Sequence, residues 1–200
     1  MVLGALLFLA GASLFAYNQH EADLADRATV NLLPELIAAI EEKNTAEEIP
    51  DATEVEVTTP VWLQPDFFEM TEVEIDGYNY IGYVSIPALE LELPVMSEWD
   101  YTRLRTAPCR YSGTTMGDDL VILAHNYKRH FGHISELQVG DSVIFTDMDG
   151  VVTYYEVAAL DVLSATAVEE MVAGDYDLTL FTCTYGGESR VTLRCDRVSK

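Results

Sequence analysis

The sequence predicts a mainly β fold: a closed or nearly closed barrel of seven or eight strands with two short helices, preceded by a helical N-terminal region. Three observations support this fold class. Short segments rich in β-branched and aromatic residues recur from about residue 72 onward. Turn residues such as Asp147-Met148-Asp149-Gly150 separate them. The residues before 44 follow a helical pattern instead.

The first segment, residues 1–17, carries no charged side chain. Its length is close to the lower limit of about 17 residues for a membrane-spanning helix. We therefore predict a transmembrane anchor at residues 1–17, with a signal segment cleaved near Ala10-Gly11-Ala12 as the alternative. Both interpretations place the rest of the chain outside the cytoplasm.

Residues 18–71 are predicted to form a helical stalk followed by an acidic linker. Between residues 19 and 43 apolar side chains recur near a helical period, at Leu24, Ala28, Leu32, Leu36 and Ile40. Pro34 predicts a kink or a restart within this helix. Residues 44–59 are acidic and poor in large apolar side chains, which is typical of a linker.

Residues 72–200 are predicted to form the β domain. The alternation LELEL directs Leu89, Leu91 and Leu93 to one face, whereas the apolar stretch at residues 119–125 predicts a strand buried on both faces. Thr166, with Glu169 three residues later, predicts the start of a short helix. The predicted strands are residues 78–86, 89–95, 119–125, 142–146, 151–163, 177–183 and 189–198.

The charge balance excludes some functions. The chain has 34 acidic and 11 basic residues, a formal charge of −23. Nucleic-acid binding needs clustered Lys and Arg to neutralise phosphates, so we expect no nucleic-acid partner. Docking on anionic lipid through a basic patch is disfavoured for the same reason.

The last two predicted strands bring a cysteine and an arginine together. If Gly186-Gly187 forms a two-residue hairpin loop, Cys183 pairs with Arg190 and Thr179 with Arg194. Directly opposed side chains share one face, so Arg190 is the predicted partner of the thiol. A nearby cation favours the nucleophilic thiolate. An odd number of cysteines is compatible with one reactive thiol, and the alternative is that all three are small buried side chains. Cys109 and Cys195 are predicted to be buried thiols, with a disulfide as the alternative.

A cysteine nucleophile also needs a group that protonates the leaving amine, and histidine is the usual one. His125 ends the apolar strand VILAH, where a rigid element would position its side chain. His133, in the segment KRHFGHISEL, is the alternative.

Taken together, these residues resemble the sortases, membrane-anchored cysteine transpeptidases of Gram-positive bacteria. The TLxTC signature of that family is matched by residues 179–183, with His125 before it and Arg190 after it. The stretch IGYVSIPALELELPV is similar to the opening strands of the family. The resemblance covers residues 76–198.

The resemblance implies an eight-stranded sortase-type barrel without a cofactor or metal. It implies that Cys183 attacks the Thr–Gly bond of an LPxTG-like sorting signal and forms a thioester, which an amine then resolves. His125 would act as general acid and then as base, and Arg190 would stabilise the oxyanion or hold the substrate. Thr182 would support the oxyanion through its hydroxyl or its backbone.

The implied partners are surface proteins with a C-terminal sorting signal and an amine acceptor such as lipid II or a peptidoglycan cross-bridge. The implied location is the cell membrane, with the catalytic domain outside. The alternatives are a cysteine endopeptidase resolved by water and a pilin-type sortase. The subclass resembles class B, with class D or an unassigned group as competitors. The order Pro65-Asp66-Phe67 is reversed relative to the lid of many pilin-building sortases, which disfavours the pilin type.

Overall fold

A computed structural model describes residues 2–47 and 69–199 and confirms a mainly β fold preceded by a long helix. The predicted linker residues 48–59 and the stretch 65–67 lie outside the described residues, while residues 44–47 belong to the helix. The elements, in chain order, are α1 (Val2–Glu47), β1 (Val73–Ile75), β2 (Tyr78–Ile86), the 3-10 helix η2 (Pro87–Leu89), β3 (Leu91–Met96), η3 (Arg103–Arg105), β4 (Cys109–Ser112), β5 (Leu120–Leu123), η4 (Phe131–Glu136), β6 (Ser142–Asp147), β7 (Val152–Ser164), α2 (Val168–Met171), β8 (Leu178–Cys183) and β9 (Ser189–Arg197).

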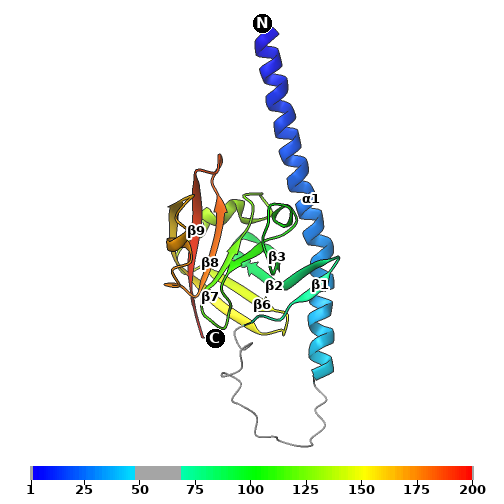
Figure 1. Ribbon diagram of the computed structural model, residues 1–200, viewed down its shortest axis with the longest axis vertical. Helices are drawn as coiled ribbons and strands as arrows, with labels where there is room; N and C mark the ends of the chain where they lie inside the picture. The colour runs from blue at the N-terminus through cyan, green and yellow to red at the C-terminus, as the bar shows by residue number, and fades with distance from the viewer. Residues whose placement is uncertain (1, 48–68, 200) are drawn as a thin grey trace, which may run out of the picture.

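Eight of the described strands form a closed barrel. They follow each other in the order β2-β3-β4-β5-β8-β9-β7-β6, and the pairing of β6 with β2 closes the ring. β1 lies outside this ring and pairs with the first residues of β2 (Figure 1). Gly82 allows the closure, because a Cβ atom there would lie 2.1 Å from the carbonyl oxygen of Thr146 on β6. The expected eight-stranded barrel is therefore confirmed, with β1 as an extra flanking strand.

Alternation along the strands separates two apolar clusters. Ile122 on β5 and Leu180 on β8 point into the barrel, and their neighbours Leu123 and Phe181 point outward into a second buried cluster. All four β5 residues are buried, which confirms the prediction of a strand covered on both faces. The outer cluster extends to α1 and to the segment between β3 and β4. The carboxyl ends of β5 and β8 are thus packed against apolar side chains on both faces of the sheet.

Helix α1 lies along the barrel with its later half and extends beyond it with its N-terminal half (Figure 1). It runs through Pro34 without a restart. Leu32, Leu36 and Ile40 are buried as predicted, whereas Leu24 is 47% exposed and Ala25 is buried in its place. A strict four-residue step drifts around a helix of 3.6 residues per turn, so the predicted stripe leaves the contact face toward the N-terminus.

The N-terminal half of α1 carries large apolar side chains that are exposed, among them Leu3, Phe8, Phe15 and Tyr17. Within residues 2–47 and 69–199, the structure contains no helix with a stretch long and apolar enough to cross a membrane.

Three local predictions differ from the structure. β3 starts at Leu91, because Pro87–Leu89 forms a 3-10 turn that ends at Glu90 with φ of +52°. Thr166 does not cap α2, which starts at Val168 after Ala167. The Thr166 backbone N–H donates to the Ser164 hydroxyl instead, and such local side-chain bonds compete with helix starts. The short strands β1 and β4 were not predicted, because three or four half-buried residues give too little alternation to stand out.

Candidate active site

Cys183 is the last residue of β8 and pairs with Arg190 on β9, as the hairpin register predicted. The predicted pair Thr179 and Arg194 is also found. The turn itself differs. The Thr184 N–H donates to the Ser189 carbonyl at 3.0 Å, so the loop contains four residues, 185–188, and not two. The register survives because the loop grows by one residue on each side.

His125 follows β5, which runs parallel to β8. In that register Leu123 lies beside Phe181, so two further residues bring His125 beside Cys183. The pairing continues past the end of β5, because the Ala124 N–H donates to the Phe181 carbonyl at 3.1 Å. Parallel strands end at the same edge of a sheet, and this places both side chains at one edge of the barrel.

Cys183, His125 and Arg190 line one cavity of about 220 Å³. Two segments supply most of its remaining walls. The segment between β3 and β4, with β4 itself, contributes Trp99, Tyr101, Leu104 and Tyr111. The segment between β7 and β8 contributes small and apolar side chains, namely Ala165, Ala167, Val168 and Met171. The three predicted catalytic residues therefore meet in a mostly apolar pocket.

The pKa of His125 is lowered from its usual value. Burial is the largest cause, since it disfavours the charged imidazolium, and the positive charge of Arg105 lowers the pKa further. Glu21 on α1 opposes both effects. The His125 ring also lies 4.8 Å from the Tyr127 ring, centroid to centroid. His125 is thus held mainly neutral at neutral pH, in the state that accepts a proton.

Arg190 is held by the turn that follows Cys183. Its Nη1 donates to the Gly187 carbonyl at 2.9 Å and to the Ser189 carbonyl at 3.1 Å. These bonds restrain a half-buried guanidinium that lines the cavity on the β9 side of the thiol. A planar guanidinium in this position can donate hydrogen bonds to an oxyanion.

Thr182 is 2% exposed, and its hydroxyl donates to the carbonyl oxygen of Ala124 at 2.8 Å. Its side chain lies on the opposite face of β8 from Cys183, since successive side chains of a strand alternate. The hydroxyl is therefore engaged between the two strands and does not point at the thiol. Support of the oxyanion by Thr182, through its hydroxyl or its backbone, stays a prediction.

The other histidines lie apart from the thiol. His133, the alternative acid–base residue, lies in η4 and pairs through Nδ1 with Glu136 at 2.5 Å. His130 is fully buried, and burial lowers its pKa to about 4. His20 is exposed on α1. Of the two predicted candidates, His125 is the one that lines the cavity with Cys183.

The three cysteines are all free. Cys109 and Cys195 are buried, and burial raises the pKa of each to about 12. The predicted buried thiols are therefore found, and the alternative disulfide is not. Cys183 is partly exposed at the cavity. Across residues 2–47 and 69–199, the structure groups no three His, Cys, Asp or Glu side chains that could hold a metal ion.

Sequence reasoning missed the aromatic wall of the cavity. Trp99 is 40% exposed, and its ring stacks on that of Tyr111 with the two centroids 5.6 Å apart. The signal that could have found it is the triplet Trp99-Asp100-Tyr101, in which two large aromatic residues flank an acidic one between strands.

The chain is similar to known sortases in sequence. A family model described as the sortase domain matches residues 84–198. A curated relative, Sortase A of Bacillus anthracis, is 28% identical over 193 residues, which cover 91% of this chain and 85% of the relative.

Solved structures with the same fold include three bacterial sortases. A Clostridium perfringens sortase D5 transpeptidase aligns with a TM-score of 0.58 and 18% identity, over 88% of this chain and 99% of that one. Sortase C1 of Streptococcus agalactiae aligns with a TM-score of 0.57 and 22% identity, over 91% of this chain and 99% of that one. Sortase C1 of Streptococcus suis is 30% identical, over 60% of this chain and 74% of that one, with a TM-score of 0.54.

Proposed function

Because this chain belongs to the sortase family of cysteine transpeptidases, we propose that Cys183, His125 and Arg190 are its catalytic residues. The observation that carries the proposal is that the ends of β5, β8 and β9 bring these three side chains to one cavity. The substrates are proteins that bear a sorting signal. We propose that the signal is LPxTG-like and is cleaved between Thr and Gly.

In the first half-reaction, the Cys183 sulfur attacks the carbonyl carbon of the scissile peptide bond. A C–S bond forms, and the C–N bond breaks when His125 gives its proton to the leaving amine. The thiol proton replaces the one that His125 donates, so the step is balanced. Arg190, on the opposite side of Cys183 from His125, donates hydrogen bonds to the oxygen that becomes negative. The product is a thioester on Cys183.

In the second half-reaction, an amine attacks the thioester carbonyl. Neutral His125 takes a proton from the amine as the C–N bond forms. The C–S bond then breaks, and His125 passes that proton to the Cys183 sulfur, which leaves as a thiol. The lowered pKa of His125 suits this step, because a base must be deprotonated at the working pH. We propose an amine of a cell wall precursor as the acceptor, such as lipid II or a peptidoglycan cross-bridge. Resolution by water would make the enzyme a peptidase instead.

We also propose a domain arrangement that fits this function. Residues 1–17 would anchor the chain in the cell membrane, supported by the exposed apolar side chains of this part of α1. Residues 18–71 would link the anchor to the catalytic barrel at residues 72–200, which would lie outside the cell. Protease treatment of intact cells that express the chain with a C-terminal tag tests this topology, because the protease should then digest the tag. Protection of the tag in intact cells would contradict the proposal.

The experiment that tests the activity is intact-protein mass spectrometry of the full chain in detergent, with pools of LPxTG-like peptides. We expect a mass gain on the wild-type protein and none on Cys183→Ala. An added amine should release the acyl group as an amide, whereas release only as an acid would favour the peptidase alternative. Turnover by Cys183→Ala above background would contradict the assignment of the nucleophile.

A further inference from the structure

The catalytic cavity has two chemically different ends on either side of Cys183. Strand β8 carries Cys183 between β5, which leads to His125, and β9, which carries Arg190. Beyond His125 the wall is built by β4 and the segment before it, and beyond Arg190 by β7 and α2. The thiol thus separates a His125 end from an Arg190 end.

The chemistry assigns a different part of the reactants to each end. The group that protonates the leaving amine must lie on the leaving-group side of the scissile bond. The same group deprotonates the incoming amine, so the acceptor arrives on that side too. The carbonyl oxygen faces the donor that stabilises it, on the other side. The His125 end therefore receives the amine.

Aromatic rings form the wall at this end. Trp99 stacks on Tyr111 at 5.6 Å and meets the Tyr101 ring edge-on at 6.2 Å. Tyr111 in turn meets Phe181 edge-on at 5.3 Å, and Phe181 lies two residues before Cys183 on the same face of β8. A continuous run of rings thus leads from the surface to the nucleophile. Trp99 and Tyr101 remain 40% and 76% exposed, so parts of both rings are accessible.

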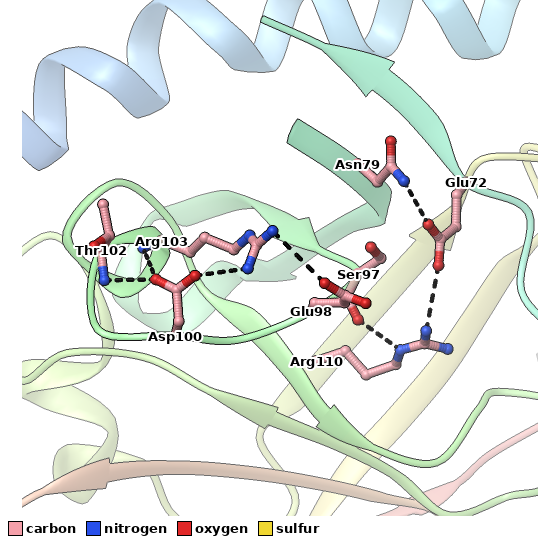
Figure 2. Close-up of polar contacts among 8 residues, drawn as sticks. All are labelled: Glu72, Asn79, Ser97, Glu98, Asp100, Thr102, Arg103 and Arg110. Carbon is pink, nitrogen blue, oxygen red and sulfur yellow. Dashed lines mark hydrogen bonds and ion pairs between the residues drawn. The ribbon is translucent and has the colours of Figure 1, made fainter. Parts of the chain in front are cut away.

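The segment that carries Trp99 and Tyr101 is held by a polar network (Figure 2). The Asp100 carboxylate accepts hydrogen bonds from the backbone N–H groups of Thr102 and Arg103, at 2.6 and 2.8 Å. It also accepts one from the Arg103 guanidinium at 2.6 Å. Farther along, Arg110 donates to the Ser97 carbonyl at 2.9 Å. The two rings are therefore presented by an anchored segment, and a preorganised wall loses little freedom on binding.

Charges of both signs lie near the wall: Glu98 and Asp100 flank Trp99, and Arg103 and Arg105 follow in the same segment. Glu98, directly before Trp99, has a side chain that is 72% exposed. The positive charge of Arg103 is shared between Glu98, at 3.6 Å, and Asp100. An ammonium group is attracted to the face of an indole or phenol ring, and a nearby carboxylate adds to that attraction.

We propose that Trp99, Tyr101 and Tyr111 form the subsite for the acyl acceptor, which binds a primary ammonium group and its alkyl stem over the aromatic faces. The ammonium is held there until it loses one proton to solvent. The neutral amine then attacks the thioester while His125 takes the second proton. This proposal rests on the proposed function, because it assigns a role to the second reactant of the same cavity.

The test measures how the thioester partitions between an amine and water. The full chain is acylated with an LPxTG-like peptide that gives an adduct, and Nα-acetyl-lysine amide is added over a range of concentrations. We expect Trp99→Ala to raise the KM for this amine by roughly 2- to 5-fold, the size of an exposed cation–π contact. The ratio of amide to acid product should fall by a similar factor. Trp99→Phe should keep most of the ratio.

Two controls make the result decisive. Val168→Ala alters the Arg190 end of the cavity and should change the KM for the peptide, not that for the amine. Tyr101→Ala, at a highly exposed position, repeats the test if Trp99→Ala does not fold. An unchanged product ratio in the Trp99 and Tyr101 variants would overturn the proposed subsite. Absence of any adduct on the wild-type chain would instead overturn the proposed function.

Discussion

The Thr182 hydroxyl donates a hydrogen bond of 2.8 Å to the carbonyl oxygen of Ala124. This bond joins the residue before Cys183 to the residue before His125. It lies next to the backbone bond from Ala124 to Phe181, so two hydrogen bonds tie the end of β5 to the end of β8. The relative position of Cys183 and His125 is therefore set by the backbones of two parallel strands and by one buried hydroxyl.

We predict that Thr182→Val lowers kcat more than it raises the peptide KM. Valine has nearly the same shape but leaves the buried Ala124 carbonyl without this donor, at a cost of about 1–3 kcal/mol in the free energy of unfolding. Thr182→Ser keeps the hydroxyl donor, so its kcat and its free energy of unfolding should stay close to those of the wild type. Steady-state kinetics and chemical denaturation of the two variants check this. Equal losses in valine and serine variants would show that the methyl group matters and the hydrogen bond does not.

Arg190 and Arg194 lie on the same strand but have different surroundings, and we predict different losses for lysine at each. Arg190→Lys keeps a charge but loses the planar fork, so kcat should fall by about 10- to 100-fold with little change in melting temperature. Acylation kinetics measured beside thermal melting separates the two effects.

Arg194→Lys is the matched control. Arg194 is 6% exposed and donates to the carbonyls of Met171 and Glu170 and to the Thr179 hydroxyl. A shorter ammonium cannot reach all three, and the loss should be about 1–3 kcal/mol in the free energy of unfolding. If both variants fold and Arg194→Lys loses more kcat than Arg190→Lys, the assignment of Arg190 as the oxyanion donor is contradicted.

The hairpin could be predicted from sequence because it depends on neighbours along the chain. The Cys183–Arg190 register needs only a symmetric loop, and it held although the loop has four residues. The sequence suggested that His125 lies near Cys183, but it could not predict how the two side chains are positioned. That position depends on the parallel pairing of β5 with β8, which are separated by more than fifty residues. The stacking of Trp99 on Tyr111 could not be located from sequence for a similar reason, since Tyr111 belongs to a strand too short to be recognised. Pairings that close over long loops leave no local pattern.

We predict that two charges near His125 shift its titration in opposite directions. Burial is the main reason for its lowered pKa, with Arg105 lowering and Glu21 raising it. Arg105→Gln should therefore raise the pKa of His125, and Glu21→Gln should lower it further. The acid limb of the aminolysis rate, where the base becomes protonated, should move with each. NMR titration of the His125 imidazole checks the direction, and shifts of the same sign in both variants would contradict this account.

His130 makes a separate contribution to the dependence of the free energy of unfolding on pH. It is fully buried and lies near Tyr127, and neither ring nitrogen has a hydrogen-bond partner among the described residues. Burial, helped by the charge of His125, lowers its pKa to about 4 from 6.5. Between these two pH values the unfolded chain binds a proton that the folded chain does not. The free energy of unfolding therefore falls as the pH drops from about 6.5 to about 4, and levels off below that.

We predict that His130→Leu removes this part of the pH dependence. One pKa unit corresponds to about 1.4 kcal/mol. The His130 contribution to the free energy of unfolding of the wild type should therefore change by on the order of 3 kcal/mol between pH 6.5 and pH 4. The variant can start from a different stability, so the informative quantity is the change with pH. Denaturation curves at a series of pH values measure it, and the titrating carboxylates contribute alike in both proteins. Parallel curves for wild type and variant would mean that His130 takes up its proton in the folded state as readily as in the unfolded chain, and that its burial does not keep it neutral.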